Sequence, residues 1–529
     1  MAPIRSTLLI AALMVLGCGD DGAAPAPDAS AEVDASGGLD AAARPDTGAA
    51  MDAAGSDTGP PRDDGGPPPD AGPPPAVVDP STLEGKLVMG YQGWFGAPGD
   101  GSRSDRWRHW SRGATPAAGN LTFDAWPDLT ELAADELHAT DLRFADGSVA
   151  GLYSAYDRRT VDHHFRWMRE TGVDGVMLQE FVVELGEGTA SREFRDGVTD
   201  NVRASAEAHG RVFAIMYDIS GSDPAWLTDR IQSHWRAVVD SGLVGSSRYL
   251  QHGGRPLVAV WGFGFDDRAG SPAQAQALID WWRSDAAPAY RATVLGGVPT
   301  HWRTLTGDSS TDPAWAAVYR SYDIISPWTV GRYADDDGVR RFRRDLVEPD
   351  LAEAGRAGAD YLPVVWPGFS WANLMPAESL NQIPRRGGQF WWTQLHEFNQ
   401  AGATMIYGAM FDEVDEGTAM FKVAPTAADA PSTGRFLTLD ADGYALPSDF
   451  YLRLAAEGAR VLRGERAPSP DRPIRGGTPT CSPPDSMAVE DRCVPSCGAA
   501  GGDSCDPAVC AGLPPLDAFD CAICCDSTP

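Results

Sequence analysis

Cysteine is absent from most of this 529-residue chain, with none between Cys18 and Cys481. The long central part therefore cannot use a thiol nucleophile, and it also lacks the CxxC, HExxH and GxSxG motifs of redox proteins, zinc proteases and serine hydrolases. Histidine is scarce as well, with nine in the chain. His163 and His164 have no second ligand at metal spacing, so we expect them to be structural surface residues, and we expect no metal and no cofactor.

Positive charge is in short supply: 43 lysines and arginines face 74 acidic residues, for a net charge of −31. Such a chain repels the phosphates of nucleic acid, so we exclude that partner. Residues 19–79 contribute 13 of the acidic residues and only two arginines. About a third of the net charge thus lies outside the central part, and the acidity says little about a binding site.

An apolar run long enough to remain as a membrane-spanning helix is missing from the N-terminus. Leu8–Leu16 is short and follows Arg5, which is typical of an export signal over residues 1–17. The string Val15-Leu16-Gly17-Cys18 resembles the lipobox of bacterial lipoproteins, in which the cysteine becomes the lipidated first residue. We therefore expect an exported protein, anchored through Cys18 in the cell envelope, with Gly19 favouring the outer membrane or cell surface. An ordinary signal peptide with a chance cysteine is the alternative.

The two ends of the mature chain differ in composition from its middle. Residues 18–79 consist mainly of Ala, Gly, Pro and Asp and cannot bury enough apolar surface to fold, which predicts a disordered tether. Residues 468–529 form a cysteine-rich C-terminal module. An even number of cysteines in an exported chain favours disulfides over a zinc cluster, although the pairing stays open. The eight are Cys481, Cys493, Cys497, Cys505, Cys510, Cys521, Cys524 and Cys525.

Eight apolar runs recur between residues 80 and 467, separated by helical patterns, which predicts an α/β fold of the (β/α)8 TIM-barrel class. An open doubly wound sheet is the competing fold, but no Gly-rich phosphate loop follows the first run. The predicted strands are 86–95, 175–181, 211–219, 256–263, 292–298, 323–329, 361–366 and 403–411. Among the helical patterns, Ser271-Pro272 predicts a capped helix start, and Val161, Phe165 and Met168 share a face before Gly172.

Glu413 and Glu416 follow the last predicted strand, in the run Phe-Asp-Glu-Val-Asp-Glu-Gly-Thr (411–418). Two carboxylates three residues apart on a turn lie roughly 5–6 Å apart, close to the about 5–5.5 Å found in retaining glycosidases. Ionising one carboxylate hinders ionisation of the other, so the pair supplies an acid and a base. An acidic surface loop or a calcium ligand set is the alternative reading of the same string.

Aromatic and acidic residues also follow the other predicted strands, at the barrel end where catalytic groups of this fold gather. Indole faces stack on the C–H faces of sugar rings, and carboxylates accept hydroxyl protons, so the set suits a neutral glycan. Core packing is the alternative for each tryptophan, and loop support for each acid. The predicted substrate-binding residues are Tyr91, Trp94, Glu180, Asp218, Trp261, Trp302, Trp328 and Trp366.

Several motifs together resemble the endo-α-mannosidase-like glycoside hydrolases of family 99 and its neighbour family 71. These are Gly90-Tyr-Gln-Gly-Trp-Phe-Gly96, Trp107-Arg-His-Trp110, Met168-Arg-Glu-Thr-Gly-Val-Asp-Gly175 and Pro447-Ser-Asp-Phe-Tyr-Leu452. The run Asp412-Glu-Val-Asp-Glu-Gly-Thr418 matches that group's Asn-Glu-Trp-His-Glu-Gly-Thr pattern. The resemblance covers roughly residues 84–464.

This resemblance implies a (β/α)8 barrel that hydrolyses α-linked glycans with retention and without a metal, Glu413 acting as base and Glu416 as general acid. In this family the base deprotonates the sugar 2-hydroxyl, which attacks its own anomeric carbon. Asp412, Val414 and Asp415 depart from the family's Asn, Trp and His, which leaves the sugar open. A non-catalytic glycan-binding surface protein is therefore the alternative function.

Overall fold

The computed structural model describes residues 77–477, together with the short stretches 485–489 and 492–495. The predicted signal peptide, Cys18, most of the tether and most of the cysteine-rich module with its disulfides lie outside these residues. Of the module, the structure gives two backbone strands, β13 (Asp485–Val489) and β14 (Arg492–Pro495), paired antiparallel.

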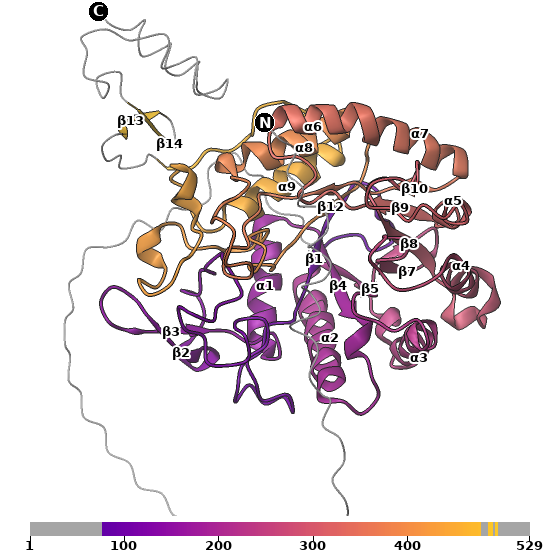
Figure 1. Ribbon diagram of the computed structural model, residues 1–529, viewed down its shortest axis with the longest axis horizontal. Coiled ribbons are helices and arrows are strands. Elements are labelled where there is room, and N and C mark those ends of the chain that lie inside the picture. The colour runs from indigo at the N-terminus through magenta and orange to yellow at the C-terminus, as the bar shows by residue number, and fades with distance from the viewer. Residues whose placement is uncertain (1–76, 478–484, 490–491, 496–529) are drawn as a thin grey trace, which may run out of the picture. The chain divides into compact units, whose positions relative to one another are not determined.

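A parallel sheet forms the centre of residues 77–477, and helices lie on its outside (Figure 1). Every one of the eight predicted strand segments contains strand structure. The sheet strands are β1 (Leu87–Tyr91), β4 (Gly175–Phe181), β5 (Val212–Asp218), β7 (Arg255–Trp261), β8 (Thr293–Val298), β9 (Ile324–Pro327), β10 (Asp360–Tyr361), β11 (Val364–Val365) and β12 (Ile406–Gly408). β6 (Gln251–His252) pairs antiparallel with β7 at the sheet's margin.

The order of these strands returns on itself. It runs β10-β9-β8-β7-β5-β4-β1-β12-β11, and its two end strands are adjacent pieces of one chain segment, with only Leu362 and Pro363 between them. The amide of Leu362 donates to the carbonyl of Ile325 on one side, while the carbonyl of Pro363 accepts from Tyr407 on the other. The result is a curled, TIM-barrel-like α/β fold, as the sequence predicts at the level of fold class.

The helices begin and end where local signals place them. Ser271 caps α4 with its hydroxyl and Pro272 is the first helical residue, while Gly172 ends α1 in a left-handed conformation. Among the described residues, no helix is both long and apolar enough to cross a membrane. The helices are α1 (Arg158–Thr171), α2 (Ala190–His209), α3 (Leu227–Asp240), α4 (Pro272–Asp280), α5 (Trp315–Tyr319), α6 (Asp336–Phe342), α7 (Glu348–Ala357), α8 (Gln389–Gln400) and α9 (Phe450–Leu462).

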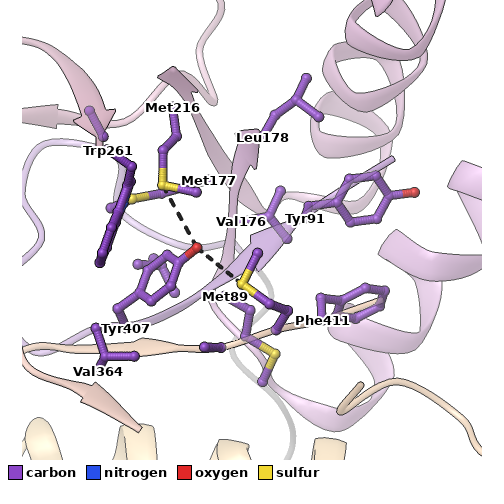
Figure 2. Packing of buried hydrophobic residues seen from close by; sticks show 14 of the residues in the cluster. Met89, Tyr91, Val176, Met177, Leu178, Met216, Trp261, Val364, Tyr407 and Phe411 are labelled. Atoms are coloured by element: carbon purple, nitrogen blue, oxygen red, sulfur yellow. Dashed lines mark hydrogen bonds between the residues drawn. The ribbon is translucent and has the colours of Figure 1, made fainter. Parts of the chain in front are cut away.

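Strand register decides which side chains point into the centre of the curled sheet. Figure 2 shows Met177, Met216 and Trp261 converging on Tyr407, whose hydroxyl lies 3.7 Å from the sulfur of Met216. Tyr91 and Leu178 point to the opposite side of their strands (Figure 2). Since side chains alternate along a strand, every second residue after Met177 on β4 faces the centre, and its neighbours face the helices.

An antiparallel pair outside the sheet, β2 (His138–Arg143) and β3 (Val149–Leu152), belongs to the long insertion between β1 and α1. The insertion reaches the loop after β12, because the amides of Asp124 and Ala125 both donate to the carbonyl of Val414, at 3.0 and 3.1 Å. It thereby adds side chains to the end of the sheet where the paired glutamates lie.

Candidate active site

The segment after β12 forms a tight turn that carries Glu413 and Glu416. The amide of Thr418 donates to the carbonyl of Glu413 at 3.1 Å, and that of Gly417 to Val414 at 3.3 Å. Gly417 has a φ of +61°, and a Cβ there would lie 2.9 Å from the side chain of Ser370, so the turn requires glycine.

Neighbouring loops hold this turn in place. The amide of Ser370 donates to the carbonyl of Glu416 at 2.9 Å. The guanidinium of Arg385 donates to the carbonyls of Gly417 and Ala419, at 2.8 and 2.7 Å. Backbone groups of an otherwise irregular segment are thus paired, which fixes the directions of its side chains.

Both glutamates are buried, Glu413 with 3% and Glu416 with 5% of its surface exposed. The hydroxyl of Thr418 donates to Oε2 of Glu413 at 3.3 Å, while Oε1 has no hydrogen-bond partner among the described residues. Neither glutamate is turned outward into bulk solvent. A buried carboxylate oxygen that lacks a protein partner is a group that a ligand can satisfy.

Burial raises the pKa values of both carboxyl groups of this pair. Burial, and next the charge of Glu416, raises the pKa of Glu413 well above its ordinary value. Burial raises the pKa of Glu416 to about 7, with the cation of Arg268 acting in the opposite direction. A carboxyl group whose pKa is about 7, as for Glu416, can both give and take a proton near neutral pH, as acid–base catalysis requires.

Two further acids flank the pair. Both oxygens of Asp412 accept backbone amides of the loop after β1, from Gln92 at 2.7 Å and Gly93 at 2.9 Å. Burial raises the pKa of Asp412 to about 6 and that of Asp415 well above its ordinary value. Asp412 thus ties the first loop to the last.

An indole pair and a tyrosine line the centre of the sheet below the turn. Trp261 and Trp328 meet edge to face with ring centroids 5.1 Å apart, and Trp261 lies 6.2 Å from Tyr407. The charges of Glu413 and Asp218 contribute to a raised pKa of Tyr407, after burial itself, so these groups are neighbours. The structure therefore brings Asp218, Trp261 and Glu413 together around Tyr407, with Trp328 packed on Trp261.

Glycine at position 297 makes room for Trp261. A Cβ on Gly297 would lie 2.0 Å from the indole of Trp261, closer than any contact permits. Asp218 is held by the amide of Gln179, which donates to its Oδ2 at 2.8 Å. Gln179 faces the centre because it lies two residues after Met177 on β4.

Trp94 stacks on a histidine contributed by the β1–α1 insertion. The centroid of its ring lies 4.0 Å from that of His109, at an interplanar angle of 7°. A second stacked ring, that of Phe181, lies 5.3 Å from Trp94 between centroids. Nδ1 of His109 lies 3.8 Å from Oδ2 of Asp415. Trp94 is thereby linked to the acidic turn through His109.

Four of the predicted substrate-binding residues lie elsewhere, in the core, and these predictions are corrected. Tyr91 points toward α1, where its hydroxyl lies 2.8 Å from Nδ1 of His164. Glu180 points toward α2 and accepts from the hydroxyl of Thr199 at 2.7 Å. Alternation along β1 and β4 turns both away from the centre. His164 is buried, contrary to the surface position that we predicted.

Trp302 and Trp366 are the other two corrections. The indole nitrogen of Trp302 donates to Asp350 of α7 at 3.1 Å. The ring of Trp366 packs on Phe390 of α8, with centroids 5.0 Å apart. Both rings fill space between the sheet and its helices and are fully buried. The loops after β8 and β11 leave their strands before these residues, so strand alternation gives no guide to their direction.

Sequence reasoning did not select Tyr407, His109 or Arg268 as site residues. Tyr407 lies inside an apolar strand, where nothing but register distinguishes it from packing residues. His109 stands in the Trp107–Trp110 motif, which was the available signal. Within the described part of the chain, no group of three or more His, Cys, Asp or Glu residues is arranged to hold a metal ion.

A separate hollow of about 190 Å³ lies between the start of α2 and α3, away from the paired glutamates. Arg192, Trp226, Arg230 and His234 contribute to its lining. The guanidinium of Arg230 covers the ring of Trp226 at 3.6 Å, which leaves that face unavailable to a sugar.

Comparison with solved structures finds the same fold in a GH99 endo-α-mannosidase from Bacteroides thetaiotaomicron. The complex of that enzyme with bis-tris-propane has 16% sequence identity and a TM-score of 0.53, covering 73% of this chain and 100% of that one. A second structure of the enzyme gives 15% identity over the same shares, again with a TM-score of 0.53. No protein-family model and no curated protein matches this chain. The predicted resemblance to the family 99 enzymes is thus confirmed at the level of fold.

Proposed function

We propose that this protein is a retaining glycoside hydrolase that cleaves α-glycosidic bonds in a polysaccharide or glycan, with Glu413 as base and Glu416 as general acid. The observation that carries the proposal is the buried carboxylate pair on a fixed turn, with Glu413 close to Tyr407 and Trp261 on the same tyrosine ring. The fold shared with an endo-α-mannosidase supports it. The proposal includes a (β/α)8 barrel without a metal or other cofactor.

The chemistry proceeds in two displacements at the anomeric carbon. Glu413 takes the proton of the sugar 2-hydroxyl while that oxygen attacks C1, and Glu416 gives its proton to the departing glycosidic oxygen. Water, deprotonated by Glu416, then attacks C1 and breaks the C1–O2 bond, and Glu413 returns its proton to O2. Each displacement inverts C1, so the product keeps the configuration of the substrate, and both carboxylates end as they began.

The surroundings of the two glutamates bear on these roles. The cation of Arg268 favours an ionised Glu416, whereas Glu413 feels the negative charges of Glu416, Asp415 and Asp412. The proposed roles require an ionised Glu413 and a protonated Glu416 when the substrate is bound. A hydrogen bond donated by the sugar 2-hydroxyl to Glu413 favours this state, because it stabilises the ionised form of Glu413.

Digestion of α-mannan, α-1,3-glucan, xylan and arabinan, with product configuration followed by NMR, tests the reaction. We expect one of the α-linked polymers to release sugar with retained configuration. Substrates with an activated aryl leaving group then separate the roles: Glu416→Gln should recover most of its lost rate on them, and Glu413→Gln should not. Inverted product, or equal recovery of both variants, would contradict the mechanism.

A glycan-binding surface protein without turnover is the second candidate. The observation that favours it is Asp415, whose charge adds to the burial that keeps Glu413 protonated and unable to act as base. Under this alternative the wild type binds an α-glycan without hydrolysing it, and Glu416→Gln changes neither property. Under the enzyme proposal, Glu416→Gln abolishes hydrolysis and leaves binding intact.

We further propose that the protein is exported and lipid-anchored at Cys18, with residues 18–79 as a tether and residues 468–529 as a disulfide-linked module. Export places a polymer-degrading enzyme where large substrates reach it. Mass spectrometry of the mature N-terminus tests the anchor: we expect a lipidated Cys18 in the wild type and none in Cys18→Ala. An unmodified N-terminus other than Cys18 in the wild type would contradict it.

A further inference from the structure

Asp415 is a buried acid with one oxygen that nothing in the described part of the chain satisfies. Only 5% of its surface is exposed, and its Oδ1 has no hydrogen-bond partner. Burial and the charges of Glu416 and Asp412 raise its pKa well above the ordinary value. A group of this kind costs free energy when left unpaired, so its retention beside Glu416 indicates a partner that arrives with the ligand.

His109 faces the other oxygen of Asp415 across a gap. Its Nδ1 lies 3.8 Å from Oδ2, which is too long for a hydrogen bond but short enough for one hydroxyl oxygen to lie within hydrogen-bond reach of both. Burial, together with the charge of Arg108, lowers the pKa of His109 to about 3, so the ring is neutral and offers one donor and one acceptor. The side chain of His109 keeps 11% exposure, which leaves it accessible to a ligand.

The position of His109 is set by its neighbours. Its backbone has a φ of +58°, a conformation that few residues other than glycine adopt. The ring lies flat on Trp94, with centroids 4.0 Å apart. Since Trp94 also stacks on Phe181, the imidazole cannot turn away from Asp415 without breaking a stack of three rings.

We propose that His109 and Asp415 form a hydroxyl-binding pair that recognises one hydroxyl of the sugar ring next to Glu416, and so sets which neutral sugar the protein accepts. The hydroxyl donates to Asp415 or accepts from it, and exchanges a second hydrogen bond with His109. This inference rests on the proposed function for its substrate class. It assigns sugar selectivity to Asp415 and to a residue of the β1–α1 insertion.

Titration calorimetry with deoxy sugars tests the pair. The ligands are the methyl glycosides of α-mannobiose and α-1,3-linked glucobiose, each with its monodeoxy analogues. In the wild type we expect one deoxy position to weaken binding at least tenfold, because its loss leaves buried polar groups unpaired. In Asp415→Leu that same position should cost less than twofold, while penalties at the other positions persist. His109→Phe, which keeps the stack on Trp94, should reduce the loss of affinity at that same deoxy position and leave the losses at the other positions unchanged.

Glu180→Gln is the matched control, since Glu180 is a buried acid with an unpartnered oxygen that faces α2 rather than the site. It should leave every deoxy penalty unchanged. Where Asp415→Leu fails to fold, Asp415→Asn and His109→Phe carry the test. Equal penalties in wild type and Asp415 variants, or no binding of either parent glycoside, would overturn the inference. Selective binding without hydrolysis would instead overturn the proposed reaction and leave the pair intact.

Discussion

Glu184 is the acid whose removal should most weaken the protein, because two buried arginines depend on it. It lies in the short helical turn after β4 and forms ion pairs with Arg108 and Arg195. The Nε of Arg195 donates to Glu184 at 2.6 Å. Arg195 also donates to the carbonyl of Gln92 at 2.7 Å, in the loop that precedes Trp94. We predict that Glu184→Gln destabilises the protein and loosens that loop.

The magnitude follows from the pKa of Glu184. Despite burial, the charges of Arg108 and Arg195 lower it from 4.5 to about 2. A shift of this size corresponds to about 3 kcal/mol, in line with the about 3–5 kcal/mol lost when a buried ion pair is broken. Since the folded pKa lies below the unfolded one, this stability is fully present above about pH 4.5 and is lost as pH falls toward 2.

Urea unfolding followed by tryptophan fluorescence measures this effect, because all 17 tryptophans lie between Trp94 and Trp392. At pH 7 the variant should be about 3 kcal/mol less stable than the wild type, and the difference should shrink between pH 4.5 and pH 3. A difference below 1 kcal/mol at pH 7, or one independent of pH, would refute the reasoning.

Glu180→Gln supplies a control of opposite sign. Burial raises the pKa of Glu180 to about 7, so its ionisation costs stability as pH rises from about 4.5 through 7, and the amide removes that cost. We expect Glu180→Gln to be at least as stable as the wild type at pH 8. At the same pH, Glu184→Gln should show its full loss of stability relative to the wild type.

Three further predictions concern the site. As the proposed general acid, Glu416 must be protonated, and with its pKa at about 7 in the free protein we expect kcat/KM to fall tenfold per pH unit above about pH 7; a flat profile from pH 6 to 9 would contradict this. Gly297→Ala should destabilise the fold by about 1–3 kcal/mol and weaken glycan affinity, since its Cβ would displace Trp261; unchanged affinity in calorimetry would remove Trp261 from the binding surface. Calcium titration should give no saturable heat, because no three acids in the described part of the chain are arranged to hold a metal ion; a saturating isotherm would favour the calcium alternative.

The strands and the turn that carries Glu413 and Glu416 were predictable because their signals are local. Apolar runs mark strands buried on both faces, and Ser271 and Gly172 mark helix ends through their own backbone preferences. The turn of Glu413 and Glu416 follows the last run directly, so its place at the carboxyl end of the sheet needed no further information.

Side-chain direction was not predictable in the same way. In a strand that is apolar throughout, hydrophobicity does not mark the inner face, and a change of one residue in register exchanges the faces. Gln179 rather than Glu180 therefore faces the centre. Trp302 and Trp366 were misplaced because they stand in loops, where no alternation applies.

The sequence by itself determined the curled α/β fold and put two glutamates three residues apart after its last strand, because both depend on short-range pattern. Only the tertiary structure decided which residues surround them. Asp415 meets His109 from an insertion some 300 positions earlier in the chain, and Trp261 fits because Gly297 on the next strand leaves space for it. Contacts of that range come from packing and register, which no local signal encodes.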